Sequence, residues 1–190
     1  MRTTNLYFST FTTLKWIHIL ENDELKKVVA DSLQFLVNTK KVIVYGFVIM
    51  PNHIHLIWQM NEGVKWRDVQ RDFFEHTEES IKFKMLGSNR AIDPVFKPNI
   101  EGNQIRIWDR NGLSIQLEDY SLIVQKLGFI HKNPVNKKWK LCKSLESYKY
   151  SSFRFYLGVD KEFDFLTSIY ELENVLGISE NTDTIMSVAC

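Results

Sequence analysis

The stretch Met50-Pro51-Asn52-His53-Ile54-His55-Leu56-Ile57 decides the fold, because it joins two apolar segments through a turn and carries two histidines one residue apart. The segment Val42–Met50 predicts one strand, and Pro51-Asn52 is a dipeptide typical of tight turns. Successive side chains of a strand project to opposite faces, so His53 and His55 are expected on one face and the apolar residues between and after them on the other. The sequence therefore predicts two consecutive strands, the second carrying a pair of imidazoles.

Such a pair suits a divalent cation, because neutral imidazoles held on a rigid strand are common metal ligands. Two ligands do not complete a coordination shell, so a third must come from elsewhere in the chain. The alternative is that His53 and His55 only line a half-buried strand.

Helical and extended patterns surround this strand pair. Residues 5–12 and 15–20 alternate apolar with polar side chains and predict extended structure. Asn22-Asp23 predicts the start of a helix to about Val37, and a second helix is expected over Lys65–Met85. The order βαββα predicts an α+β fold of the ferredoxin-like split βαβ type, with a central antiparallel sheet and helices packed on it.

The second half of the chain is less regular. Residues 86–104 are rich in turn-forming residues and predict a mobile surface loop. A strand over Ile105–Asp109, the turn Asn111-Gly112 and a returning strand over Ser114–Leu117 are expected next. A helix then begins at Glu118 or Asp119 and ends near Lys132, because Pro134 disfavours helical geometry in the residue before it.

One domain is expected over residues 1–170, followed by a C-terminal extension over 171–190, and a short amphipathic helix is expected over Ile169–Leu176, across that boundary. The 24 basic and 23 acidic residues give a net charge of +1, which by itself does not indicate a nucleic-acid partner. Cys142 and Cys190 are too few for a disulfide framework, and no run of apolar residues is long enough for a membrane span. We expect an intracellular, cytoplasmic protein that is not bound to a membrane.

Two blocks of sequence carry a family resemblance. Residues 45–57 (YGFVIMPNHIHLI) and 125–135 (QKLGFIHKNPV) together resemble the HUH-type single-strand DNA transposases, in particular their REP-associated tyrosine transposase branch. Residues 107–110 (IWDR) resemble a third family block, and weaker similarity extends over residues 8–156. The resemblance implies single-stranded, hairpin-containing DNA as partner, Mg²⁺ or Mn²⁺ as cofactor, and cleavage and rejoining of a DNA strand through a 5′-phosphotyrosine. Monomer and homodimer both remain open.

The resemblance also assigns roles to individual residues. His53, His55 and Asn133 are the implied metal ligands, and Phe129 occupies the position of the nucleophilic tyrosine. Asn133 follows Phe129 by four residues, a spacing that places both on one face of a helix, although a role as the helix C-cap is the alternative. Phenylalanine carries no oxygen that could attack phosphorus, so the family reaction is expected to be absent. The tyrosines considered as replacements are Tyr120, Tyr148 and Tyr150.

The expected DNA-binding residues are basic or aromatic side chains near these blocks. They are Lys65, Arg67, Arg71, Arg110, Lys137, Lys138, Trp139 and Lys140. The alternative for the lysines and arginines is an ordinary solvated surface. Glu75, Glu78 and Glu79 on the second helix are expected to repel phosphates.

Two other functions stay open. The first is a domesticated regulatory module that binds hairpin DNA without cutting it. The second is a metal-dependent hydrolase in which His53, His55 and a carboxylate activate water. A protein-linked cleavage product would distinguish the transposase from the first, and a hydrolytic product would indicate the second.

Overall fold

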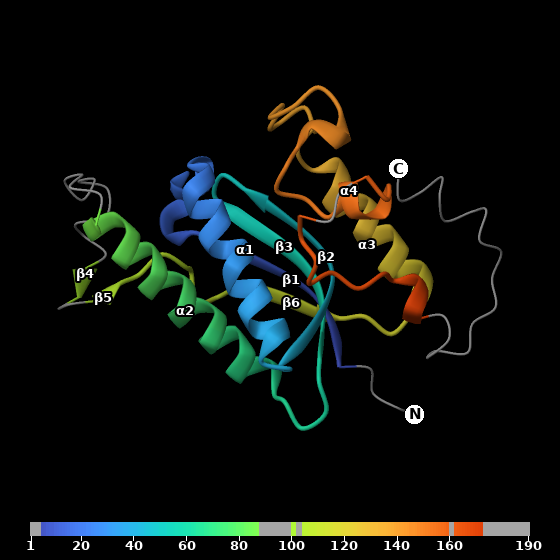
Figure 1. Ribbon diagram of the computed structural model, residues 1–190, viewed down its shortest axis with the longest axis horizontal. Helices are drawn as coiled ribbons and strands as arrows, with labels where there is room; N and C mark the ends of the chain where they lie inside the picture. The colour runs from blue at the N-terminus through green and yellow to red at the C-terminus, as the bar shows by residue number, and fades with distance from the viewer. Residues whose placement is uncertain (1–4, 88–99, 102–103, 160–161, 173–190) are drawn as a thin grey trace.

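The computed structural model describes residues 5–87, 100–101, 104–159 and 162–172, and a four-stranded antiparallel sheet lies at its centre (Figure 1). The strands of this sheet, in the order β2-β3-β1-β6, are β2 (Val42–Met50), β3 (His53–Met60), β1 (Leu6–Thr12) and β6 (Leu113–Gln116). The predicted α+β class and central antiparallel sheet are confirmed.

Helices cover both faces of the sheet. Figure 1 shows α1 (Asp23–Asn38) and α2 (Trp66–Gly87) side by side in front of the strands, with α3 (Tyr120–Lys132) apart from them. Phe73 of α2 packs on Phe11 and Trp58, whereas α3 contacts the opposite face through Phe8. The shorter elements are α4 (Phe153–Tyr156), the 3₁₀ turns η1 (Leu14–Trp16), η2 (Ile19–Glu21) and η4 (Leu145–Ser147), and the small hairpin of β4 (Ile100–Glu101) and β5 (Gln104–Ile105).

Side-chain caps begin two of the helices where the sequence predicted them. The Asn22 Oδ1 atom accepts the Glu24 N–H at 2.8 Å, and the Asp119 Oδ1 atom accepts the Leu122 N–H at 3.1 Å. These short side chains satisfy backbone donors that have no partner within the first turn. Both starting points could be read from sequence because the capping interaction is local.

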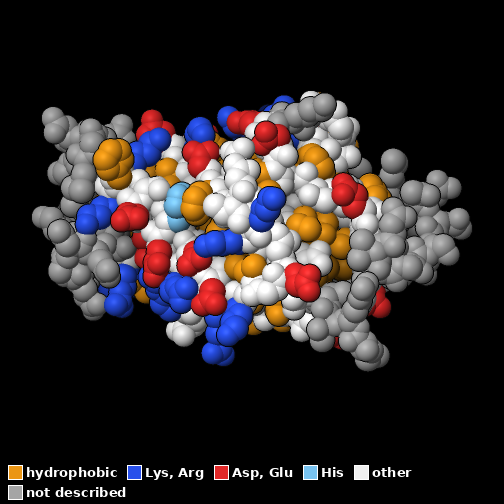
Figure 2. All heavy atoms as spheres, turned by 60° about the horizontal axis from the view of Figure 1, so that its bottom comes forward, with side chains coloured by type: hydrophobic (Ala, Val, Ile, Leu, Met, Phe, Trp, Pro, Cys, Tyr) orange, Lys and Arg blue, Asp and Glu red, His pale blue; other side chains and the backbone are white. Residues whose placement is uncertain are grey.

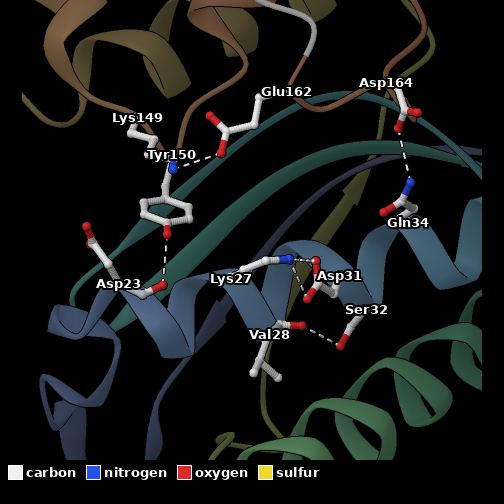
Figure 3. Close-up of polar contacts among 10 residues, drawn as sticks. All are labelled: Asp23, Lys27, Val28, Asp31, Ser32, Gln34, Lys149, Tyr150, Glu162 and Asp164. Carbon is white, nitrogen blue, oxygen red and sulfur yellow. Dashed lines mark hydrogen bonds and ion pairs between the residues drawn. The ribbon is translucent and has the colours of Figure 1, made fainter.

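The described residues of the segment 148–164, namely 148–159 and 162–164, are joined to the domain through α1 (Figure 3). The Tyr150 hydroxyl donates to the Asp23 carbonyl at 2.8 Å, and the Gln34 amide donates to Asp164 at 3.0 Å. Within the segment, Lys149 pairs with Glu162 at 2.8 Å. The two contacts with α1 join residues more than a hundred positions apart, so the aromatic segment after α3 belongs to the core fold.

The predicted strand over 15–20 is wrong. Residues 14–16 and 19–21 form 3₁₀ turns, and Lys15 and Trp16 have φ of 55° and 58°, in the left-handed region. A strand requires negative φ throughout, so the alternation of apolar and polar residues does not reflect a strand here. Ile19 and Leu20 are buried by the turn, whereas Trp16 is exposed.

The predicted strand over 105–109 is also largely wrong. Only Gln104–Ile105 is a strand, and Trp108 makes a single bridge with Thr13. The N–H groups of Ile107 and Trp108 donate instead to the buried carboxylate of Glu78, at 2.9 and 3.1 Å. β6 pairs with β1 and not back on this segment, whose residues Ile107 and Asp109 bond to Leu14 and Thr12 just after β1 and at its end.

Two expectations fall partly outside the described residues. The loop over 86–104 is described only at its ends, where 100–101 and 104–105 form the small hairpin. The C-terminal helix is described over 170–172 only. Within the described part of the chain, no helix is long and apolar enough to cross a membrane.

Candidate metal and nucleic-acid site

The two histidines of β3 project to the sheet face on which α3 lies. Their ring centroids are 4.7 Å apart, with the planes at 74°, and both side chains are buried. In the register of the sheet, His55 lies opposite Thr10 of β1 and Val48 of β2, and His53 lies opposite Thr12 and Met50. The predicted two-pronged imidazole arrangement on one strand face is therefore present.

A neighbouring side chain orients each ring through its Nδ1 atom. The His53 Nδ1 lies 2.8 Å from the Asn52 Oδ1, and the Asn52 Nδ2 donates to the Trp16 carbonyl, which fixes the amide orientation. An amide oxygen only accepts, so the Nδ1 of His53 donates and its Nε2 keeps the lone pair. The His55 Nδ1 lies 2.8 Å from the Thr10 hydroxyl, which can accept in the same way. Metal-binding histidines usually have such a partner on the second ring nitrogen.

Burial keeps both imidazoles neutral. It lowers the pKa of His53 to about 4, with smaller contributions from the positive charges of Lys138 and His18. It lowers the pKa of His55 to about 3, with smaller contributions from His53 and Lys126. A neutral imidazole is the form that binds a metal ion, so both groups are available as ligands at neutral pH.

Helix α3 places Phe129 against this pair. The ring of Phe129 is 48% exposed, 5.1 Å from the imidazole of His55 and 6.1 Å from the ring of Phe8. One turn earlier, the Lys126 Nζ lies 5.0 Å from the centre of the Phe8 ring. A side chain at position 129 therefore reaches both His55 and solvent.

Gly46 of β2 allows α3 to lie this close to the sheet. A Cβ atom at this position would come within 2.6 Å of the Leu127 Cδ1 atom, closer than non-bonded carbons approach each other. Glycine in a strand often marks such a close approach of another element.

Asn133 is buried at the C-cap of α3, which confirms its structural role. Its φ and ψ of −59° and −47° are helical, so the predicted reason for the helix end is wrong. The helix ends because Pro134 has no N–H for the Ile130 carbonyl, to which the Asn133 N–H donates at 3.3 Å. The convergence of the Asn133 amide with His53 and His55 stays a prediction.

The three tyrosines considered as replacement nucleophiles have structural roles. The Tyr148 hydroxyl donates to the Ile49 carbonyl at 2.7 Å, the Tyr150 hydroxyl donates to Asp23, and Tyr120 is buried at the start of α3. Burial raises the pKa of Tyr148 and of Tyr150, which makes each phenol a poorer source of phenolate. These contacts favour packing over catalysis.

Trp139 connects the basic cluster after α3 to the imidazoles. Its ring lies 5.4 Å from His53 and 5.7 Å from His18, and the Lys138 Nζ lies 5.4 Å from its centre. Lys137 and Lys140 are exposed beside it. The structure thus brings this part of the predicted DNA-binding set next to the histidines.

The basic residues of α2 lie apart from the histidines, because α2 packs on the opposite face of the sheet. Arg71 pairs with Asp68 at 3.1 Å and with Asp72 at 3.5 Å, whereas Lys65 and Arg67 are exposed. Figure 2, turned toward the side of α2, shows Lys and Arg side chains mixed with Asp and Glu side chains. DNA binding by these residues stays a prediction, and the structure does not connect them to the site.

Glu78 was expected to repel phosphates together with Glu75 and Glu79, and for Glu78 this expectation is wrong. Its buried carboxylate accepts the N–H groups of Ile107 and Trp108 and pairs at 2.7 Å with the half-exposed Arg110, so the charge of Glu78 is already paired within the protein. Glu75 and Glu79 are exposed. The sequence did contain a signal, because Glu78 is spaced four residues after Phe74 and three before Ile81, which are both buried.

Sequence reasoning also missed Thr10 and Asn52, which hold the imidazoles. Asn52 could have been found, because it directly precedes His53. Thr10 could not, because its position opposite His55 depends on the pairing of β1 with β3. Among the described residues, no three His, Cys, Asp or Glu side chains gather as metal ligands, so an ion at His53 and His55 would need an amide such as Asn133 or water.

No protein-family model matches the sequence, and no curated protein sequence matches it. Solved structures do match the fold. A REP-associated tyrosine transposase bound to a REP hairpin has a TM-score of 0.61 and 14% identity, over 82% of this chain and 81% of that one. A candidate transposase from Deinococcus radiodurans has a TM-score of 0.47 and 14% identity, over 68% of this chain and 90% of that one. At this identity, the likeness to the first structure establishes a shared fold.

Proposed function

We propose that this chain is a transposase-like protein that binds single-stranded, hairpin-containing DNA and a divalent metal ion without cutting the DNA. The observation that carries the proposal is the pair His53 and His55. Both imidazoles are neutral, and the Nδ1 of each is held by a neighbouring side chain, with Phe129 of α3 against His55.

His53 and His55 fit a metal ion, and Asn133 is the proposed third ligand. Nitrogen and oxygen ligands together accept Mg²⁺ or Mn²⁺, although they do not select between them. When bound, such an ion supplies a Lewis acid that polarises a phosphate oxygen. The protein's own contribution is to hold the two imidazoles in one orientation, through Thr10 and Asn52, on a buried strand.

The shared fold and the local charge support a DNA ligand. The matching transposase was solved with a REP hairpin, and its fold is that of this chain. The exposed lysines 137, 138 and 140 stand beside Trp139, which packs on His53, so positive charge and an aromatic ring lie next to the imidazoles. Phosphate neutralisation by lysine and stacking of bases on aromatic rings are the usual basis of single-strand binding.

The absence of cleavage follows from the residue against His55. Phe129 supplies no attacking oxygen, and Tyr148 and Tyr150 donate their hydroxyls to backbone carbonyls. These observations favour the second candidate, a domesticated binding or regulatory protein, over an active transposase. They do not favour the hydrolase, because no carboxylate of the described residues joins the two imidazoles in a ligand group.

Two titrations test the proposal. Mn²⁺ should bind the unmodified protein and bind His53→Asn/His55→Asn at least tenfold more weakly, because loss of ligands removes the site. His76→Asn is the matched control, because His76 stacks on Phe35 of α1 and lies on the other face of the sheet. A labelled hairpin with a single-stranded extension should bind and should weaken steeply between about 50 and 200 mM salt. Equal Mn²⁺ affinity of both proteins, or no DNA binding at low salt, would contradict the proposal.

A further inference from the structure

The turn between β1 and α1 presents a tryptophan in an unfavourable backbone conformation. Lys15 and Trp16 are consecutive and both left-handed, with φ of 55° and 58°, and the Trp16 side chain is 59% exposed. Left-handed geometry is uncommon for bulky residues, and two such residues in succession need a surrounding structure that imposes it. The exposed ring gains little from burial, so packing does not explain why a tryptophan stands here.

Hydrogen bonds join this turn to the turn between β2 and β3, which directly precedes His53. The Thr13 N–H and hydroxyl both donate to the Asn52 carbonyl, at 2.9 and 3.1 Å, and the Trp16 N–H donates to the Thr13 carbonyl at 3.0 Å. The Asn52 Nδ2 donates to the Trp16 carbonyl at 3.2 Å, while its Oδ1 accepts from His53. One amide therefore fixes both the Trp16 backbone and the His53 ring.

The surroundings of the turn are aromatic and basic. His18, two residues after Trp16, lies 5.7 Å from Trp139, whose other neighbours are His53 and Lys138. Trp16 thus lies at the border of the imidazole site, because its carbonyl binds the Asn52 side chain that holds His53, and His18 two residues later contacts Trp139.

We propose that Trp16 is a base-stacking residue that binds an unpaired base of the DNA strand next to His53. This inference rests on the proposed function and adds to it a contact residue outside the three sequence blocks. The ligand is an unpaired base rather than a duplex, because only an unstacked base offers a free ring face to an exposed indole. Stacking on an aromatic ring accepts any base, so Trp16 contributes affinity rather than sequence preference.

The backbone strain makes a sharp test possible. Glycine adopts left-handed φ without the Cβ conflict, so Trp16→Gly should keep or raise the melting temperature. The same change should weaken binding of a single-stranded oligonucleotide about tenfold, the order expected for loss of one stacked base. Trp16→Phe should retain most of the affinity. Mn²⁺ affinity should stay unchanged in both variants, because Trp16 is not a ligand.

Two control variants separate stacking from other effects. Lys40→Gly relaxes a left-handed residue with φ of 56° before β2 and should stabilise the protein with no change in DNA affinity. Phe83→Ala removes an 81% exposed aromatic ring from α2, on the other side of the sheet, and should also leave DNA affinity unchanged.

The outcomes distinguish this inference from the proposed function. If the unmodified protein binds the oligonucleotide and Trp16→Gly binds it equally well, the inference is overturned and the proposed function stands. If Trp16→Gly lowers the melting temperature by several degrees, the ring has a packing role and the inference is again overturned. If the unmodified protein binds no single-stranded DNA even at low salt, both are overturned.

Discussion

The ring of Phe129 stands against the imidazole of His55, with centroids 5.1 Å apart and planes at 66°. Phe129 comes from α3 and His55 from β3, and the contact places a half-exposed benzene ring beside a neutral, buried imidazole. A tyrosine in the same place would carry a hydroxyl on an exposed ring next to a candidate metal ligand. In the function proposed above, the difference between binding and cutting DNA therefore rests on one oxygen atom at this position.

Phe129→Tyr is expected to create a cutting activity that the unmodified chain lacks. With Mg²⁺ or Mn²⁺, the unmodified protein should leave an end-labelled hairpin strand uncut, because Phe129 has no attacking atom. The variant should form a covalent protein–DNA species, visible as a shifted band in a denaturing gel. Phe129→Tyr combined with His55→Asn is the control and should form none. Cutting by the unmodified protein would show that another group supplies the nucleophile.

The depressed histidine pKa values predict a pH-dependent stability. The pKa of His55 is about 3 in the folded protein and ordinarily 6.5, so the unfolded chain takes up a proton that the folded chain refuses. The lowered pKa of His55 therefore contributes to the free energy of unfolding. This contribution is fully present above pH 6.5 and is lost as pH falls toward 3. Between about pH 7.5 and pH 5, the loss from this group is about 2 kcal/mol.

His55→Asn measures how much of the acid-induced loss of stability comes from His55, because asparagine can keep the contact with Thr10 and does not titrate. Urea unfolding at both pH values should show a smaller acid-induced loss in the variant than in the unmodified protein. An equal loss in the unmodified protein and in His55→Asn would show that the imidazole titrates normally.

Glu78→Ala is expected to destabilise the protein by about 2 to 4 kcal/mol. The change leaves the buried N–H groups of Ile107 and Trp108 without their acceptor and breaks the pair with Arg110. Chemical denaturation monitored by tryptophan fluorescence measures it, since Trp108 lies in the affected segment. Glu79→Ala, an exposed change one residue along the helix, should cost under about 0.5 kcal/mol. Similar effects of both variants would mean that the Glu78 contacts contribute nothing.

The lysines after α3 are expected to set the salt dependence of DNA binding. Lys138→Ala/Lys140→Ala should weaken binding and reduce the slope of log affinity against log salt by about 1.4, because each of the two phosphate contacts on a single strand contributes about 0.7. Lys27→Ala/Lys149→Ala removes two lysines that are already paired with Asp31 and Glu162, and it should leave the slope unchanged. Anisotropy titrations at several salt concentrations give both slopes. Equal slopes in the two double variants would show that Lys138 and Lys140 do not contact DNA phosphates.

Local signals were sufficient for much of the fold. Asn22 and Asp119 were recognisable as helix starts because a cap contacts backbone within three residues. The alternation of His53 and His55 with apolar residues placed both imidazoles on one strand face, because the period of a strand is fixed by backbone geometry. The failures at 15–20 and 105–109 have the same physical origin, since distant groups there overrode the local pattern. Asn52 holds Trp16 in a left-handed turn, and Glu78 takes the donors that a strand would have used.

The sequence by itself determined the identity and the spacing of the chemical groups, namely two imidazoles on one strand, a ring without oxygen at position 129, and Asn133 four residues later. Only the tertiary structure decided their state and their neighbours. Burial in the folded protein lowers the pKa of His53 and His55, β1 supplies Thr10 to one ring, and the chain after α3 returns Trp139 to the other. These effects depend on strand order and on desolvation, which arise from contacts between residues far apart in the chain, so no local stretch of sequence encodes them.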